Sequence, residues 1–216
     1  MRIFLIAGVA VLLSLTSCVT LLQSLLTQDN IVTDDRLAGQ WTGNDSKNLL
    51  VQKMMDSKFK PTIQELDKHD YTEDDSLFFT KLYAISFREN NLNYSWLCGL
   101  VRIKDQYYLN FEPQECLTAL KKESYTLEGQ SFFTTTSFAK IEWKGENDLS
   151  LHFFNGDRLK KIILNGNARI SYEYDPLFET FVITASSKEL EQFLEKYGNN
   201  ESLYDGGLTL NLVRKK

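Results

Sequence analysis

Regular alternation of apolar and polar side chains in the middle of the chain constrains its fold more than any other feature. YAISFRE (83–89) and QYYLNFE (106–112) both alternate with a period of two. Between them, YSWLCGLVRI (94–103) is apolar on both faces. Alternation indicates half-buried strands, and a doubly apolar run indicates a strand covered on both faces. Because only short polar connections separate these runs, we predict three successive antiparallel strands.

Further strand and helix patterns follow towards the C-terminus. SFAKIEWKG (137–145) and DLSLHFFN (148–155) predict a second hairpin. A turn follows, in which Asp157 is expected to cap a short helix over residues 158–164. FVITA (181–185) predicts another strand.

The last 31 residues combine one amphipathic helix with one strand. Ser186 and Glu189 form a capping-box pattern, and Gly198 is placed to end the helix. Apolar residues recur at helical spacing between them: Leu190, Phe193, Leu194 and Tyr197. LTLNLVR (208–214) predicts the final strand. We therefore expect an α+β fold over residues 37–216, a single domain that is mostly an antiparallel, barrel-like sheet with a C-terminal helix and final strand.

Leu37-Ala38-Gly39-Gln40-Trp41 opens this domain with the pattern Gly, any residue, Trp. The pattern resembles the signature of lipocalins and calycins. The resemblance implies a lipocalin-like barrel in which Trp41 closes one end and an Arg from a late strand lies over its ring. Arg214 is the candidate, because it shares the parity of the inward-facing leucines of the last strand. A Trp packed in an unrelated β-rich core is the alternative.

Aromatic side chains are frequent on the predicted strands, and they favour two interpretations of the interior. A wide barrel lined by them would hold a small apolar ligand, whereas a fully packed core would use them equally well. The set is Tyr83, Phe87, Trp96, Tyr107, Phe111, Trp143 and Phe153.

LSLTSC (13–18) closes a long uncharged region after Arg2 that begins with the almost wholly apolar stretch Ile3–Leu15. At ~1.5 Å per residue this stretch is too short for the ~30 Å hydrocarbon core of a bilayer. The segment resembles the lipobox of bacterial lipoproteins, and the chain is similar in style to envelope lipoproteins of Bacteroidetes-type bacteria. That resemblance implies a signal peptide (1–17) that is cleaved before Cys18.

The same resemblance implies that Cys18 carries a diacylglyceryl thioether and an acylated amino group, for example a palmitate, and that residues 18–36 form a tether. The expected location is the cell envelope, with the outer membrane favoured over the inner membrane. An ordinary cleaved signal is one alternative. An uncleaved helix over residues 3–26 is another.

Lipidation of Cys18 leaves Cys98 and Cys116 as a candidate disulfide pair in an oxidising compartment. Two separate buried thiols are the alternative, since free cysteines behave as small apolar residues.

The composition argues against several classes of function. A net charge of −5 at pH 7 argues against nucleic-acid binding, which favours basic patches. His69 and His152 are the only histidines, and no serine elbow, phosphate loop or metal-binding His pair is present. Glu73-Asp74-Asp75 lacks the alternating ligands of a calcium loop. We expect no enzyme, metal or cofactor.

Two functions then remain in view, with a hydrolase as a weaker third. The first is a lipid-anchored carrier for a small apolar ligand. The second is a non-enzymatic structural or interaction lipoprotein of an envelope complex, which would work through its outer surface.

Overall fold

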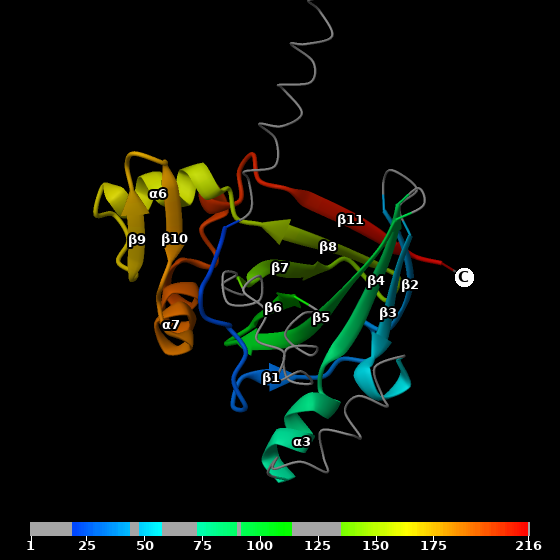
Figure 1. Ribbon diagram of the computed structural model, residues 1–216. Coiled ribbons are helices and arrows are strands. Elements are labelled where there is room, and N and C mark those ends of the chain that lie inside the picture. Colours follow the sequence, from blue (N-terminus) through cyan, green and yellow to red (C-terminus); the bar gives the residue numbers. More distant parts are fainter. Residues whose placement is uncertain (1–18, 44–47, 58–72, 90–91, 114–134, 216) are drawn as a thin grey trace, which may run out of the picture.

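Eight antiparallel strands, taken in chain order, form the wall of a closed barrel in the computed structural model (Figure 1). The structure describes residues 19–43, 48–57, 73–89, 92–113 and 135–215. The barrel strands are β2 (Gly39–Gly43), β3 (Asn48–Lys53), β4 (Tyr83–Glu89), β5 (Leu92–Ile103), β6 (Gln106–Pro113), β7 (Ser137–Trp143), β8 (Asp148–Phe153) and β11 (Thr209–Arg214). Each strand pairs with the next, and β11 also pairs with β2, which closes the sheet. The predicted lipocalin-like α+β barrel is confirmed.

The alternation in the sequence decides which side chains point into this barrel. On β4, Tyr83 and Ile85 are buried in the interior cluster, whereas Ala84 packs outside the wall. On β5, Leu100 lies in the interior cluster and its neighbour Val101 in an outer one. The half-buried and the doubly covered strand patterns are therefore both confirmed.

Two hairpins also form where the sequence predicts them. Residues 104 and 105 connect β5 to β6, with Ile103 paired to Gln106 and Lys104 in the left-handed region at φ 55°. Residues 144–147 connect β7 to β8, and Lys144 N donates to Asp148 O at 2.9 Å. Both connections are short because consecutive antiparallel strands need only a turn between them.

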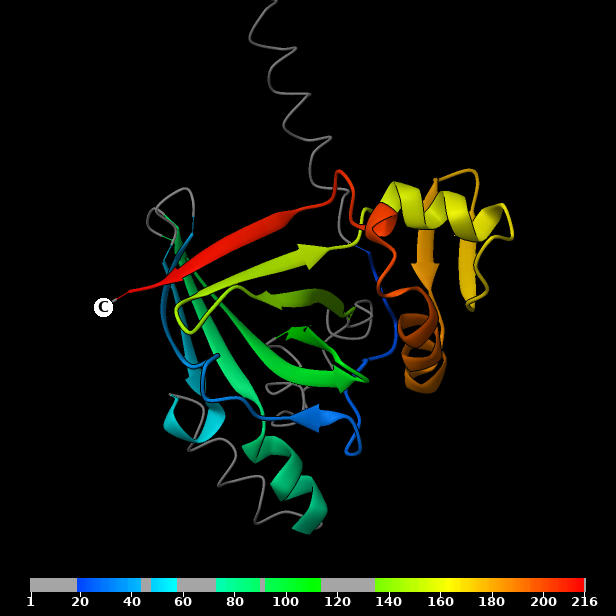
Figure 2. The same ribbon diagram turned by 180° about the vertical axis from the view of Figure 1, so that it is seen from behind.

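A smaller insert separates β8 from β11 and lies on one flank of the barrel (Figures 1 and 2). It contains α6 (Gly156–Leu164), β9 (Tyr172–Asp175), β10 (Thr180–Ile183), α7 (Ser187–Tyr197) and the 3-10 turn η3 (Glu201–Leu203). The strand predicted at 181–185 is β10. It pairs with β9 in a separate two-stranded sheet, so the insert leaves the order of the barrel strands intact.

The caps of the two helices in the insert show what local sequence can specify. Around α7 the predicted capping box is present: Ser186 Oγ accepts from Glu189 N, and Glu189 Oε2 accepts from Ser186 N. For α6 the expected cap is wrong. Asn155, rather than Asp157, accepts from Arg158 N at 3.1 Å, because α6 begins at Gly156 and Asp157 already lies in its first turn.

The N-terminal segment differs from the expected tether over residues 18–36. From residue 19 onward the chain is packed against the domain, and Leu21 and Leu25 have no exposed surface. Leu21 bridges Thr136 on one side and Ile183 on the other, and β1 (Ile31–Val32) pairs with β5. The outer wall of the barrel is apolar here, so covering it with this segment removes both surfaces from water.

A third apolar cluster covers the wall near the start of β4. It joins Ile31 and Leu97 to η2 (Met54–Asp56) and α3 (Glu73–Thr80). The acidic run at 73–75 forms the start of α3.

Candidate functional site in the barrel interior

The interior of the barrel holds an apolar cluster to which all eight strands contribute inward side chains. Its buried members are Leu37, Trp41, Val51, Tyr83, Ile85, Cys98, Leu100, Leu109, Ala139, Ile141, Leu149, Leu151 and Leu212. We call the end where β2 begins and β11 finishes the closed end, and the opposite end the open end.

The closed end contains the pair that the resemblance to lipocalins implies. Trp41 on β2 is 1% exposed, and its Nε1 donates to Leu37 O at 2.9 Å. Arg214 pairs in register with Trp41, and its guanidinium carbon lies 4.5 Å from the centroid of the indole ring. Such a cation–π contact contributes ~0.5–2 kcal/mol. Arg214 also donates from Nη1 to Ala38 O at 2.7 Å and from Nη2 to Arg36 O.

Gly39 makes this arrangement possible. Its φ of +145° disfavours residues with a side chain, and a Cβ at this position would collide with Arg214 Nη1. Gly39 and Trp41 are two residues apart on one strand, so both face the same guanidinium. The spacing Gly, any residue, Trp therefore has a direct steric explanation.

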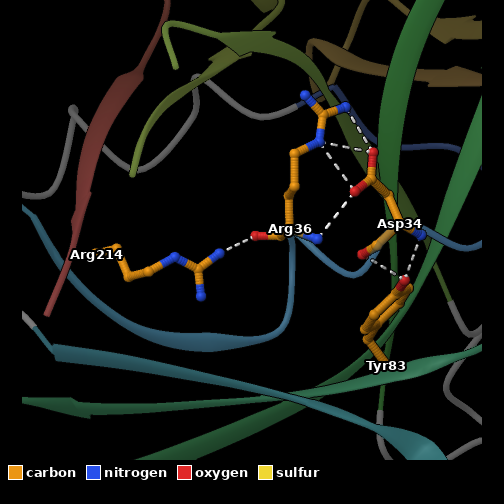
Figure 3. A network of polar contacts seen from close by, with 4 residues as sticks. All are labelled: Asp34, Arg36, Tyr83 and Arg214. Atoms are coloured by element: carbon orange, nitrogen blue, oxygen red, sulfur yellow. Dashed lines mark hydrogen bonds and ion pairs between the residues drawn. The ribbon is translucent and has the colours of Figure 1, made fainter. Parts of the chain in front are cut away.

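A polar strap crosses the same end, and the sequence did not predict it (Figure 3). Arg36 binds the Asp34 carboxylate through Nε at 3.0 and 3.1 Å and through Nη2 at 2.6 Å. The Tyr83 hydroxyl accepts from Asp34 N at 2.8 Å and donates to Asp34 O at 3.0 Å. Hydrogen bonding by Arg36 lowers the pKa of Asp34, whereas burial raises the pKa of Tyr83. The strap thus ties the chain before β2 to the wall at β4.

A second arginine lies over a second tryptophan at this end. The Arg36 guanidinium carbon is 4.4 Å from the ring centroid of Trp143 at the end of β7. Within the described part of the chain, Trp143 Nε1 is the buried side-chain donor that has no hydrogen-bond partner. No sequence signal joins residues 36 and 143, because they meet only when the sheet closes and the segment before β2 crosses the end of the barrel.

Inward apolar side chains near the open end keep part of their surface exposed: Leu49, Trp96, Phe111, Phe153 and Leu210. The rings of Phe111 and Phe153 stack at 5.7 Å across β7, where Ala139 leaves room between them. Trp96 lies 6.5 Å from Phe87. The partly exposed inward side chains therefore gather at the open end of the barrel, whereas Trp41 at the closed end is buried.

The two described residues that sequence analysis considered for chemistry lie on opposite faces of the wall. Cys98 is a free thiol with no exposed surface inside the barrel, and burial raises its pKa well above the usual range. His152 points outward, with Nε2 3.1 Å from Glu142 Oε2 and Nδ1 3.3 Å from Thr209 Oγ1. The structure therefore does not bring a cysteine nucleophile to the histidine.

His152 lines an outer cavity of about 490 Å³ between β7, β8 and the segment 201–209. Glu142, His152 and Thr209 form a short chain of polar contacts beside this cavity, of the kind that can relay a proton. The Glu142 side chain is 58% exposed, however, so water competes with His152 for its carboxylate. Among the described residues, no group of three or more His, Cys, Asp or Glu side chains is placed to hold a metal ion.

The remaining predicted sites, Cys18, Cys116 and His69, lie outside the described residues. In the part of the chain that the structure describes, no helix combines the length and apolar character needed to cross a membrane. Comparison of the chain with protein-family models, with curated proteins and with solved structures found no match.

Proposed function

We propose that this chain is a lipid-anchored protein of the cell envelope whose barrel binds a small apolar ligand in its open half. The observation that carries the proposal is the set of inward, partly exposed apolar residues described above, which includes Trp96, Phe111 and Phe153. Ligand pockets are mostly apolar and aromatic, and eight-stranded barrels are wide enough to hold one small ligand.

The sealed closed end supports a carrier rather than a channel. Trp41, Arg214 and the strap formed by Asp34 and Arg36 occupy that end with aromatic rings, guanidinium groups and backbone hydrogen bonds. A ligand would therefore enter and leave by the open end.

Two substitutions on the same strand test binding. Leu210→Trp adds bulk inside the open half, whereas Val213→Trp adds it at a position 52% exposed on the outer face. The probe is N-phenyl-1-naphthylamine, titrated into the purified protein and followed by its own fluorescence. We expect saturable binding by the wild type, at least about tenfold weaker binding for Leu210→Trp (~1.4 kcal/mol) and no change for Val213→Trp. No saturable binding, or equal losses in both variants, would overturn the proposal.

The anchor is tested separately, by mass spectrometry of the detergent-purified mature protein and by fractionation of Cys18→Ser. We expect cleavage after Ser17 and the added mass of a diacylglyceryl group with an acylated amino terminus. We also expect that Cys18→Ser is not lipidated. A mature protein with an unmodified Cys18 or a retained leader would contradict the anchor without affecting ligand binding.

A further inference from the structure

The turn between β9 and β10 exposes two large apolar side chains. Leu177 is 81% exposed and Phe178 is 75% exposed, well above the other exposed large apolar residues that the structure describes. Both lie in Asp175-Pro176-Leu177-Phe178-Glu179, at the tip of the hairpin. Adjacent exposed apolar residues at a tip need an explanation, whereas scattered single ones do not.

Hydrogen bonds between two side chains and the backbone hold the tip in shape. Asp175 Oδ1 accepts from Leu177 N at 2.8 Å and from Phe178 N at 3.3 Å. Lys160 of α6 donates to Glu179 O at 3.4 Å and lies 4.4 Å from the centroid of the Tyr174 ring. The turn therefore presents two apolar side chains beside a lysine whose ammonium group can remain in the headgroup region.

The start of the described chain runs beside this hairpin. Leu22 N donates to Ile183 O at 3.0 Å, and Ile183 N donates to Thr20 O at 3.1 Å. The bridge between Leu21 and Ile183 is parallel. The two segments therefore run side by side in the same direction. Because β10 begins at the tip of the hairpin, Val19 lies on the tip side of Leu21.

Two views agree on this placement. The first described residues and the β9–β10 turn lie towards the same end of the molecule in Figure 1 and in Figure 2. The Cα atom of residue 18 must lie about 3.8 Å from that of Val19. A lipid on Cys18 would thus enter a bilayer on the side of the domain where the apolar tip projects.

We propose that Leu177 and Phe178 insert into the leaflet that holds the lipid of Cys18, giving the domain a second membrane contact and a fixed orientation. This inference rests on the lipid anchor proposed above. The occupant is a bilayer rather than a protein partner, because the tip and the attachment point share one end of the molecule. The charged residues of α6, β9 and the turn have both signs, so insertion is not expected to require anionic lipid. They are Asp157, Arg158, Lys160, Lys161, Glu173, Asp175 and Glu179.

The test uses the full-length lipoprotein reconstituted into phosphatidylcholine vesicles. Leu177→Cys, in a Cys116→Ser background, is labelled with the polarity-sensitive dye NBD, and Phe178→Cys provides a second position. Cys98 has no exposed surface and stays unlabelled. Val213→Cys is the matched control, since Val213 is 52% exposed on β11, whose C-terminal end lies on the opposite flank of the barrel from the hairpin (Figures 1 and 2).

We expect the labels at 177 and 178 to shift their emission to the blue, to be quenched by doxyl-labelled lipid and to lose quenching by aqueous iodide. The label at 213 should show no blue shift and no quenching by doxyl-labelled lipid, and it should remain open to quenching by iodide. Vesicle flotation is measured on the same samples. Protein that fails to float contradicts the anchor itself.

Two further outcomes would overturn insertion while the anchor stands. In the first, floating protein has labels at 177 and 213 that are equally open to iodide. In the second, the label at 177 is shielded from iodide without any quenching by doxyl lipid, which indicates a protein contact at the tip.

Discussion

Gly39 occupies a backbone position at the closed end where a side chain has no room. Its left-handed φ and its contact with Arg214 act together, so substitution strains the backbone and displaces the guanidinium from Trp41. This residue links the backbone conformation at the start of β2 to the seal at the end of the barrel.

Gly39→Ala is expected to destabilise the fold by about 1–3 kcal/mol, the usual cost of holding a residue in a strained backbone region. Urea unfolding followed by circular dichroism measures the loss. Gly145→Ala is the control, because nothing lies within 4 Å of a Cβ there and its φ is not in the left-handed region. That variant should stay within about 0.5 kcal/mol of wild type. Equal effects of the two changes would contradict the steric explanation.

Glu112 is a largely buried carboxyl group beneath the N-terminal segment. Its Oε1 accepts from Ser24 Oγ and, at 2.7 Å, from Asn110 Nδ2. Burial raises the pKa of Glu112, and the two hydrogen bonds oppose that rise. Because its pKa is higher in the fold, the stability that it contributes is complete below the ordinary glutamate pKa. That contribution is lost as pH rises through the folded pKa.

Glu112→Gln should therefore raise the unfolding temperature at pH 7, since glutamine keeps the accepting Oε1 and removes the buried charge. The difference should disappear below about pH 4, where the glutamate of both folded and unfolded protein is mostly protonated. Thermal unfolding at the two pH values measures it. A variant that is less stable than wild type at pH 7 would show that the charge itself holds the Ser24 contact.

At the scale of elements, the N-terminal segment is part of the core rather than a spacer. Leu25 N donates to Asn110 Oδ1 at 3.2 Å, Asn30 Nδ2 donates to Leu25 O at 2.9 Å, and Ser187 Oγ donates to Ser24 O at 2.6 Å. The segment thus bonds to β6 and to α7. The proposed lipid on Cys18 would hold the domain close to the membrane, because the next residue, Val19, already packs against the domain.

Leu21→Ala and Leu25→Ala are each expected to cost about 2–5 kcal/mol, as for other fully buried leucines. Gln23→Ala changes an exposed side chain of the same segment and should cost less than about 0.5 kcal/mol. Denaturant unfolding of the three variants compares them. Leucine variants as stable as Gln23→Ala would restore the interpretation of this segment as a tether.

At the scale of the whole molecule, the barrel and the insert differ in how completely they are paired. β5 has neighbours on both edges and apolar clusters on both faces. β9 is the edge of a two-stranded sheet, and most of its side chains are exposed. Strands with few buried contacts open more readily than those in a core.

Hydrogen exchange followed by mass spectrometry should therefore find the slowest amides in β5 and much faster ones in β9. Binding of the apolar probe should slow exchange in the barrel strands and leave β9 unchanged. Protection of β9 equal to that of β5 in free protein would contradict this division of stability.

Local patterns predicted those parts of the molecule that depend on neighbours in sequence. Period two over 83–89 and 106–112 identified strands and their inward residues, because side chains alternate along any strand. The capping box at Ser186 and Glu189 was predictable for the same reason, since its partners are three residues apart. The pairing of Trp41 with Arg214 came from a resemblance, because these residues lie 173 positions apart (214 − 41) and no local pattern joins them.

The sequence alone determined most of the barrel strands, their inner and outer faces and the amphipathic helix α7 of the insert, since each follows from side-chain periodicity within one short segment. Only the tertiary structure decided that Leu21 is core, that Arg36 covers Trp143 and that Cys98 faces away from His152. These contacts arise when the sheet closes on itself. Closure sets the register between distant strands, and no local pattern of residues carries that register.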